Sequence, residues 1–90
     1  MSRLLITLNP SICDALKQSL LSEQWLITHQ DAGQTHLVGW GYEITWKKSA
    51  GSVTLRYFDK QGVATAFLEI NQEALSEIQT LVDELNESHG

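Results

Sequence analysis

The spacing of apolar residues changes twice along the chain, and each change predicts a different kind of element. Near the start, Leu4, Ile6 and Leu8 occupy alternate positions, which predicts a short strand with at least one buried face. Asn9 and Pro10 follow directly. This pair is typical of a helix start, because an Asn side chain caps a helix and Pro lacks an N–H that the first turn does not need.

Two segments repeat their apolar residues with the period of an amphipathic helix. The first runs from Pro10 to about Ser22, and the second follows Asn71, which we expect to act as its N-cap. The two apolar stripes are Ile12, Cys13, Leu16 and Leu20 in the first segment, and Leu75, Ile78, Val82 and Leu85 in the second. The opposite edge of the second helix is acidic.

Between the helices, from Gln24 to Ile70, the period is two, which predicts strands. Turns at residues 31–34, 48–51 and 59–62 divide this stretch into a four-stranded antiparallel meander. The expected cross-strand partners are Trp25 with Trp40, Ile27 with Val38, His29 with His36, Trp46 with Val53, Ile44 with Leu55, Tyr42 with Tyr57, Tyr57 with Ala64, Leu55 with Ala66 and Val53 with Leu68.

The resulting order is strand, helix, four strands, helix, which predicts an α+β fold. The simplest architecture is a two-layer sandwich, in which two helices cover one face of an antiparallel sheet of four to five strands. The first strand can join either edge of that sheet. We expect residues 1–90 to form a single compact domain, with residues 88–90 as a flexible tail.

The two faces of the predicted sheet differ in composition. One face carries the large aromatic residues, namely Trp25, Trp40, Tyr42, Trp46 and Tyr57. The other face is mostly polar, as a solvated face should be, but it also carries Leu26, Leu37, Phe58, Val63 and Phe67. Apolar residues on an uncovered face indicate either ordinary scattered hydrophobes or a surface for association.

The charge of the chain excludes some partners. Six Lys and Arg stand against eleven Asp and Glu, for a net charge of −5, so neither nucleic acid nor an anionic membrane is an expected partner. No apolar run approaches the ~18 residues of a membrane span, and no targeting segment is evident. With Cys13 as the single cysteine, no internal disulfide is possible, and we expect a cytoplasmic protein.

Candidate catalytic and metal-binding residues are few. His29 and His36, if opposed across two strands, place two imidazoles near one another, but two ligands are too few for zinc, so no metal or cofactor is predicted. Cys13 lies in the apolar stripe of the first helix and is expected to pack as a small hydrophobe. The chain offers no combination of nucleophile, base and oxyanion site, so no catalytic residue is predicted.

Two hypotheses for the function follow from these patterns. In the first, the protein is a non-enzymatic interaction module that binds itself, as a homodimer, or another protein, through an apolar sheet face or a strand edge. The expected contact residues are Leu37, Phe58, Val63 and Phe67. In the second, a recess between sheet and helices, lined by Trp25, Trp40 and Tyr42, binds an aromatic or cationic small molecule.

Overall fold

The computed structural model describes residues 3–35, 39–60 and 62–89, and its elements follow the predicted order. In chain order they are β1 (Arg3–Leu8), the 3-10 turn η1 (Pro10–Ile12), α1 (Cys13–Ser22), β2 (Leu26–Thr35), β3 (Gly39–Lys48), β4 (Gly51–Lys60), β5 (Val63–Asn71) and α2 (Gln72–His89). The α+β fold class is therefore confirmed. The second helix continues to His89, into the segment expected to be a tail.

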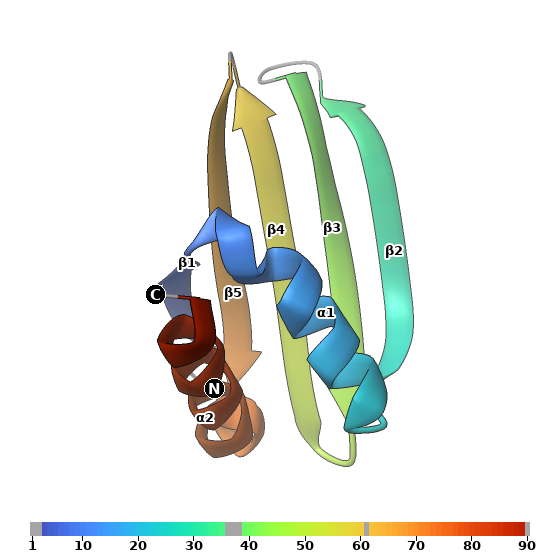
Figure 1. Cartoon of the computed structure of the whole chain (residues 1–90). Helices are drawn as coiled ribbons and strands as arrows, with labels where there is room; N and C mark the ends of the chain where they lie inside the picture. The colour runs from blue at the N-terminus through green and yellow to red at the C-terminus, as the bar shows by residue number, and fades with distance from the viewer. Residues whose placement is uncertain (1–2, 36–38, 61, 90) are drawn as a thin grey trace.

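All five strands form one antiparallel sheet in the order β1-β5-β4-β3-β2. The last four strands form the predicted meander, and β1 joins its β5 edge. Both helices lie on the same face of the sheet, so the molecule has two layers and the opposite face carries no helix (Figure 1). Of the described helices, none is both long and apolar enough to cross a bilayer.

Both helix starts have the predicted caps. The Asn9 side chain oxygen accepts a hydrogen bond from the backbone N–H of Ser11 at 3.0 Å, directly before Pro10. The Asn71 side chain oxygen accepts from the N–H of Ala74 at 3.2 Å and also from the N–H of Ser52 at 2.9 Å. Asn71 therefore caps α2 and also fixes the start of β4 beneath it.

The core lies between the sheet and the two helices, and the predicted alternation of side chains is confirmed there. Both predicted helix stripes face this core, and Leu68 is buried beneath the helices while its neighbour Phe67 lies on the opposite face. The sheet contributes Leu8, Ile44, Trp46, Val53, Leu55, Ala66, Leu68 and Ile70 to the core.

The predicted strand registers are correct for one hairpin and shifted for another. Between β3 and β4, Tyr42 lies opposite Tyr57, as expected, and the partners of Ile44 and Trp46 are also those predicted. Between β4 and β5 the prediction is wrong by two residues, because Leu55 lies opposite Leu68 instead of Ala66. Only residues 61 and 62 separate the strands, and Gly62 has a φ of 82°, which favours glycine. A shift of two residues leaves every side chain on its predicted face.

The predicted register of the β2–β3 hairpin is also wrong. Ile27 lies opposite Trp46, His29 lies opposite Thr45, and Trp40 lies opposite Gln34. The expected turn at 31–34 is part of β2, which continues to Thr35, and β3 begins at Gly39. Residues 36–38 lie outside the described residues. Continuing the strands adds backbone pairs as far as Thr35 and places the apolar pair of Ile27 and Trp46 on the helix side.

A register shift between Ile27 and His29 changes which face the following side chains occupy. Such a β-bulge adds a residue to one strand without a partner on the other. His29 consequently belongs with Thr45 on the face without helices, whereas the sequence had placed it on the face of Ile27. Among the strand pairs whose register is described, only β2 with β3 has such a shift. The bulge explains why side chains of β2 do not alternate strictly between the two faces of the sheet.

Candidate functional site

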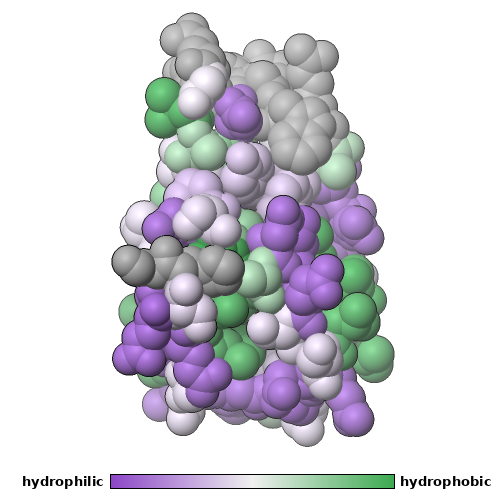
Figure 2. Space-filling model, in the orientation of Figure 1, coloured by the Kyte–Doolittle hydropathy of each residue, from purple (hydrophilic) through white to green (hydrophobic). Residues whose placement is uncertain are grey.

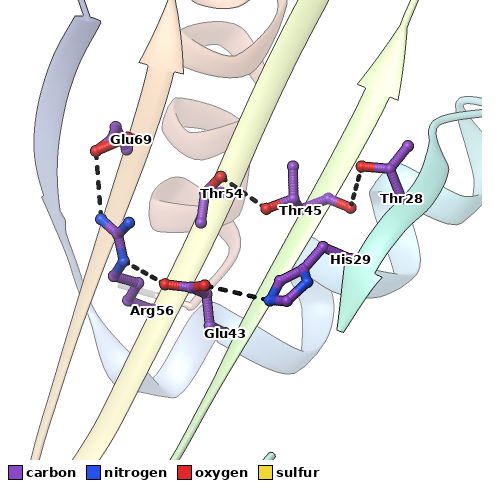
Figure 3. Close-up of polar contacts among 7 residues, drawn as sticks. All are labelled: Thr28, His29, Glu43, Thr45, Thr54, Arg56 and Glu69. Atoms are coloured by element: carbon purple, nitrogen blue, oxygen red, sulfur yellow. Dashed lines mark hydrogen bonds and ion pairs between the residues drawn. The ribbon is translucent and has the colours of Figure 1, made fainter. Parts of the chain in front are cut away.

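The face of the sheet without helices, called the open face below, carries a row of polar side chains across its middle (Figure 3). The row begins at His29 on β2 and continues through Glu43 on β3 and Arg56 on β4 to Glu69 on β5. These residues come from four strands, and the meander brings them side by side because cross-strand partners share a face.

Arg56 is the centre of this polar row. Its Nε donates a hydrogen bond to Oε2 of Glu43 at 2.6 Å, and its Nη1 donates to Oε2 of Glu69 at 3.3 Å. The other carboxylate oxygen of Glu43 lies 3.4 Å from Nε2 of His29. The hydrogen bond to Glu43 raises the pKa of the Arg56 guanidinium, so Arg56 remains charged at any working pH.

Threonines extend the polar row toward the β2 edge. The hydroxyl groups of Thr45 and Thr54 are 2.9 Å apart, and the Thr28 hydroxyl donates to the backbone carbonyl of Thr45 at 3.4 Å. None of these contacts requires a ligand or a second chain. Each residue of the row therefore has at least one polar partner within a single copy of the domain.

An apolar patch lies beside the polar row, and three of the four predicted contact residues form it. The Phe58 and Phe67 rings are 6.3 Å apart and tilted by 58°, and Val63 is 66% exposed on the same face. A Cβ added at Gly41 would come within 3.1 Å of a Phe58 ring carbon, so this glycine leaves room for Phe58. The fourth predicted residue, Leu37, lies outside the described residues.

The predicted pair of histidines does not form as expected. His29 lies opposite Thr45 and contacts Glu43 instead of a second imidazole, and His36 lies outside the described residues. Within the ranges that the structure describes, no group of three or more His, Cys, Asp or Glu is arranged to hold a metal ion.

The first of the aromatic residues predicted to line a recess, Trp25, is buried near the β3–β4 turn. Its indole Nε1 donates to Oε2 of Glu77 at 2.9 Å, and the same oxygen accepts from Nζ of Lys48 at 3.1 Å. A recess of about 210 Å³ opens beside this group, and Gly51 and Glu73 also line it. Tyr42 is not among the residues that line this recess.

Tyr42 lies in different surroundings, above the middle of β3 and β4. Its ring stacks on Tyr57 with centroids 5.1 Å apart, and Nζ of Lys17 lies 4.6 Å from its ring centroid. Burial raises the pKa of the Tyr42 hydroxyl above its usual value. Trp40 takes a register position between Gln34 and Asp59. The structure thus gives Trp25 and Tyr42 separate neighbours.

Cys13 packs in the core, as its position in the apolar stripe predicts. Burial raises the pKa of its thiol to about 11, so the thiol is protonated at neutral pH and is a poor nucleophile. Its Sγ is 4.0 Å from the backbone carbonyl oxygen of Asn9, a weak hydrogen bond that orients it. These surroundings indicate a structural role for Cys13.

A groove between α1 and β2 is a feature that sequence reasoning missed. It has a volume of about 420 Å³ and combines apolar residues with charged residues of α1. Its lining residues are Asp14, Lys17, Gln18, Leu21, Ile27, Gln30, Ile44 and Trp46. Figure 2 shows apolar surface along the β2 side of the molecule. Leu21 and Ile27 of the groove lining are exposed. In the sequence, the groove between α1 and β2 is indicated only by Leu21, an apolar residue that falls outside the apolar stripe of its helix.

The fold and the site define this chain as a two-layer α+β domain with one uncovered sheet face. No protein-family model, no curated protein and no solved structure matches the chain.

Proposed function

We propose that this protein is a non-enzymatic interaction module that binds a second copy of itself, open face against open face. The proposal rests on one observation, namely that the helices cover only one of the two faces of the sheet. Both helices lie on one face, while the open face holds Phe58 and Phe67 side by side next to the exposed Val63. Sheets stacked face to face lie about 10 Å apart, and side chains such as these interdigitate between them.

The polar row supports this arrangement because it needs no partner from outside. Burying a polar group without a hydrogen bond costs about 1–3 kcal/mol, which normally keeps charged residues out of interfaces. Here Glu43 and Glu69 both accept hydrogen bonds from Arg56, and Thr45 bonds to Thr54. A second sheet can cover this row without leaving these groups unpaired.

The distribution of charge also favours a second copy as the partner. On the open face, Lys47 and Arg56 nearly balance Asp31, Glu43 and Glu69. The excess of negative charge lies instead on α2, whose sequence contains five acids and no Lys or Arg. Stacking two open faces places the two α2 helices on the outer sides of the pair, where their like charges are far apart.

The single cysteine is buried and unpaired, and it fits a reducing compartment. We therefore place the module in the cytoplasm.

The small-molecule alternative has less support, because Trp25 is bonded to Glu77 in one recess while Tyr42 stacks on Tyr57. A shift in tryptophan emission on adding aromatic or cationic compounds would favour that alternative.

The test is the mass in solution, measured by light scattering or sedimentation. We expect a mass of at least two chains at micromolar concentration, and a single-chain mass at about 100 µM would overturn the proposal. Phe67→Glu adds a charge in the centre of the patch and should lower the mass without unfolding the domain, as checked by circular dichroism.

A matched control separates the open face from a general effect of charge. Leu21 is also exposed and apolar, but it lies on α1, on the helix side. Leu21→Glu adds the same charge there, so it should leave the mass unchanged. An equal loss of mass in both variants would contradict the assignment of the interface to the open face.

A further inference from the structure

Among the described residues, four of the six exposed large apolar side chains lie on the two edge strands of the sheet. On β1, Leu4 is 46% exposed and Leu5 is 63% exposed. They point to opposite faces, because Leu4 lies opposite the buried Ile70 and Leu5 lies opposite Glu69. On β2, at the other edge, Leu26 and Ile27 are exposed in the same way. A strand that is apolar on both faces is typical of a sheet that is covered on both faces.

The edge formed by β2 carries features that oppose pairing with another strand. The register shift between Ile27 and His29 interrupts its ladder, and bulges at edges are a common protection against unwanted pairing. Asp31 is exposed farther along this strand, directly opposite Glu43. A second β2 strand placed here would bring further acids close to these two, which is unfavourable.

The edge formed by β1 has less protection. Its register with β5 is regular from Arg3 to Leu8, its one charged residue is Arg3 at the start of the strand, and it contains no proline. Native edge strands usually contain a charge, a proline or a bulge that prevents pairing. In β1 the backbone groups that face away from β5 are therefore available for another strand.

The sequence of β1 is complementary to itself. In any two-fold antiparallel pairing that keeps the helices of both copies on one side, even-numbered residues meet even-numbered residues. On the helix side, Leu4 and the half-buried Ile6 of one copy then meet even-numbered positions of the other copy, while Leu8 stays buried in the core of its own copy. On the open face, the odd-numbered positions Arg3, Leu5 and Thr7 meet odd-numbered positions of the other copy. No acid from β1 takes part.

The charges of α2 do not prevent this pairing. Glu73, Glu77 and Glu84 line a groove with Glu23, which places them on the side of α2 that faces α1. By helical geometry the flank turned toward β1 carries Leu75, Gln79 and Asp83, and the Gln79 side chain donates a hydrogen bond to the Asp83 carboxylate at 3.1 Å. Because β1 and β5 of each copy separate the two α2 helices, their axes lie roughly 20 Å apart, well beyond the ~8 Å over which salt screens charge.

We propose that a second copy of this chain adds to the sheet at β1, pairing antiparallel with it around a two-fold axis to form one continuous sheet. Pairing of β1 with β2 of another copy is disfavoured by the bulge of β2, and repeated head to tail it gives an open filament instead of a closed pair. This inference rests on the proposed self-association, but it uses a different surface. With both surfaces occupied, two extended sheets stack by their open faces, and the assembly contains four chains.

The test compares variants that each block one surface. Leu4→Lys places a charge in the apolar set on the helix side of β1, and Phe67→Glu blocks the open face. Leu21→Lys is the matched control, since it adds the same charge to an exposed leucine away from β1. By sedimentation at about 100 µM, we expect a mass of four chains for the natural sequence, two for each single variant and one for the double variant.

The outcomes separate the two proposals. A Leu4→Lys variant that keeps the natural mass overturns pairing at β1 and leaves the proposed open-face contact intact. If Phe67→Glu instead keeps the natural mass while Leu4→Lys lowers it, the open-face contact fails and pairing at β1 stands. A loss of mass in Leu21→Lys equal to that in Leu4→Lys would also overturn the inference, because the effect would then be one of charge alone.

Amide hydrogen exchange provides a readout that does not depend on a variant. Pairing at β1 protects the backbone N–H groups of that strand that face away from β5, and this protection should decrease on dilution. The outer N–H groups of β2 should exchange at the same rate at every concentration. Exchange in β1 that does not change with concentration, in a sample whose mass does change, would overturn pairing at this edge.

Discussion

Trp25 and Glu77 join two distant parts of the chain by a hydrogen bond of 2.9 Å between the indole Nε1 and a carboxylate oxygen. Trp25 directly precedes β2, and Glu77 lies in the second turn of α2. The same oxygen accepts a hydrogen bond from Lys48 at the end of β3. This contact holds the second helix to the part of the sheet that lies farthest from β1.

Replacing Glu77 by alanine tests the contribution of this contact to stability. The substitution leaves the N–H of the buried Trp25 without its acceptor, so we expect a loss of about 1–3 kcal/mol in the free energy of unfolding. Urea denaturation followed by tryptophan fluorescence measures the change. Glu84→Ala removes an exposed acid from the same helix, beyond its first turn, and should change the free energy by less than about 0.5 kcal/mol. Equal effects of the two substitutions would contradict this role of Glu77.

The same carboxylate should make stability depend on pH. The hydrogen bond from Trp25, and secondly the hydrogen bond and charge of Lys48, lower the pKa of Glu77 below its usual value of 4.5. Its contribution is therefore present above about pH 4.5 and is lost as pH falls through the lower pKa of the folded state. Glu77→Gln removes the titrating group, so its stability should change less than that of the natural protein between pH 6 and pH 3. Parallel pH profiles would refute the prediction.

Gly41 should not tolerate a side chain. A Cβ at this position would lie 2.6 Å from the backbone carbonyl oxygen of Tyr57, and the backbone of a sheet cannot move away cheaply. We expect Gly41→Ala to destabilise the domain by roughly 1–3 kcal/mol in urea denaturation. Because the closest contact is with backbone, adding Phe58→Ala should not restore the lost stability. Restoration in the double variant would show that the Phe58 ring is the main obstacle.

The thiol of Cys13 should be unreactive while the domain is folded. Its pKa of about 11 leaves little thiolate at pH 8, and the side chain is buried. We expect a disulfide reagent to label Cys13 only after denaturant is added. Since the folded pKa is raised from 9.0, the protonated thiol contributes stability that is present below pH 9 and lost as pH rises toward 11. Rapid labelling in buffer at pH 8 would contradict this assignment.

Local patterns in the sequence were sufficient to predict the elements and the face of most side chains. The caps at Asn9 and Asn71, the two apolar stripes and the β3–β4 register all depend on neighbours within a few residues or on one short turn. The predicted face of each side chain is correct even where the β4–β5 register is shifted, because a shift of two residues leaves every side chain on the same face. The placement of Phe58, Val63 and Phe67 on the open face was therefore predictable.

The tertiary structure decided the edge that β1 joins, the register of β2 with β3 and the bulge before His29. Short turns of similar length differ little in the entropy of closing them, so local sequence does not choose among these registers. The choice depends on the sum of cross-strand contacts, such as Ile27 with Trp46, between residues far apart in the chain. The sequence by itself thus determined which side chains each element presents, and long-range packing decided which of them meet.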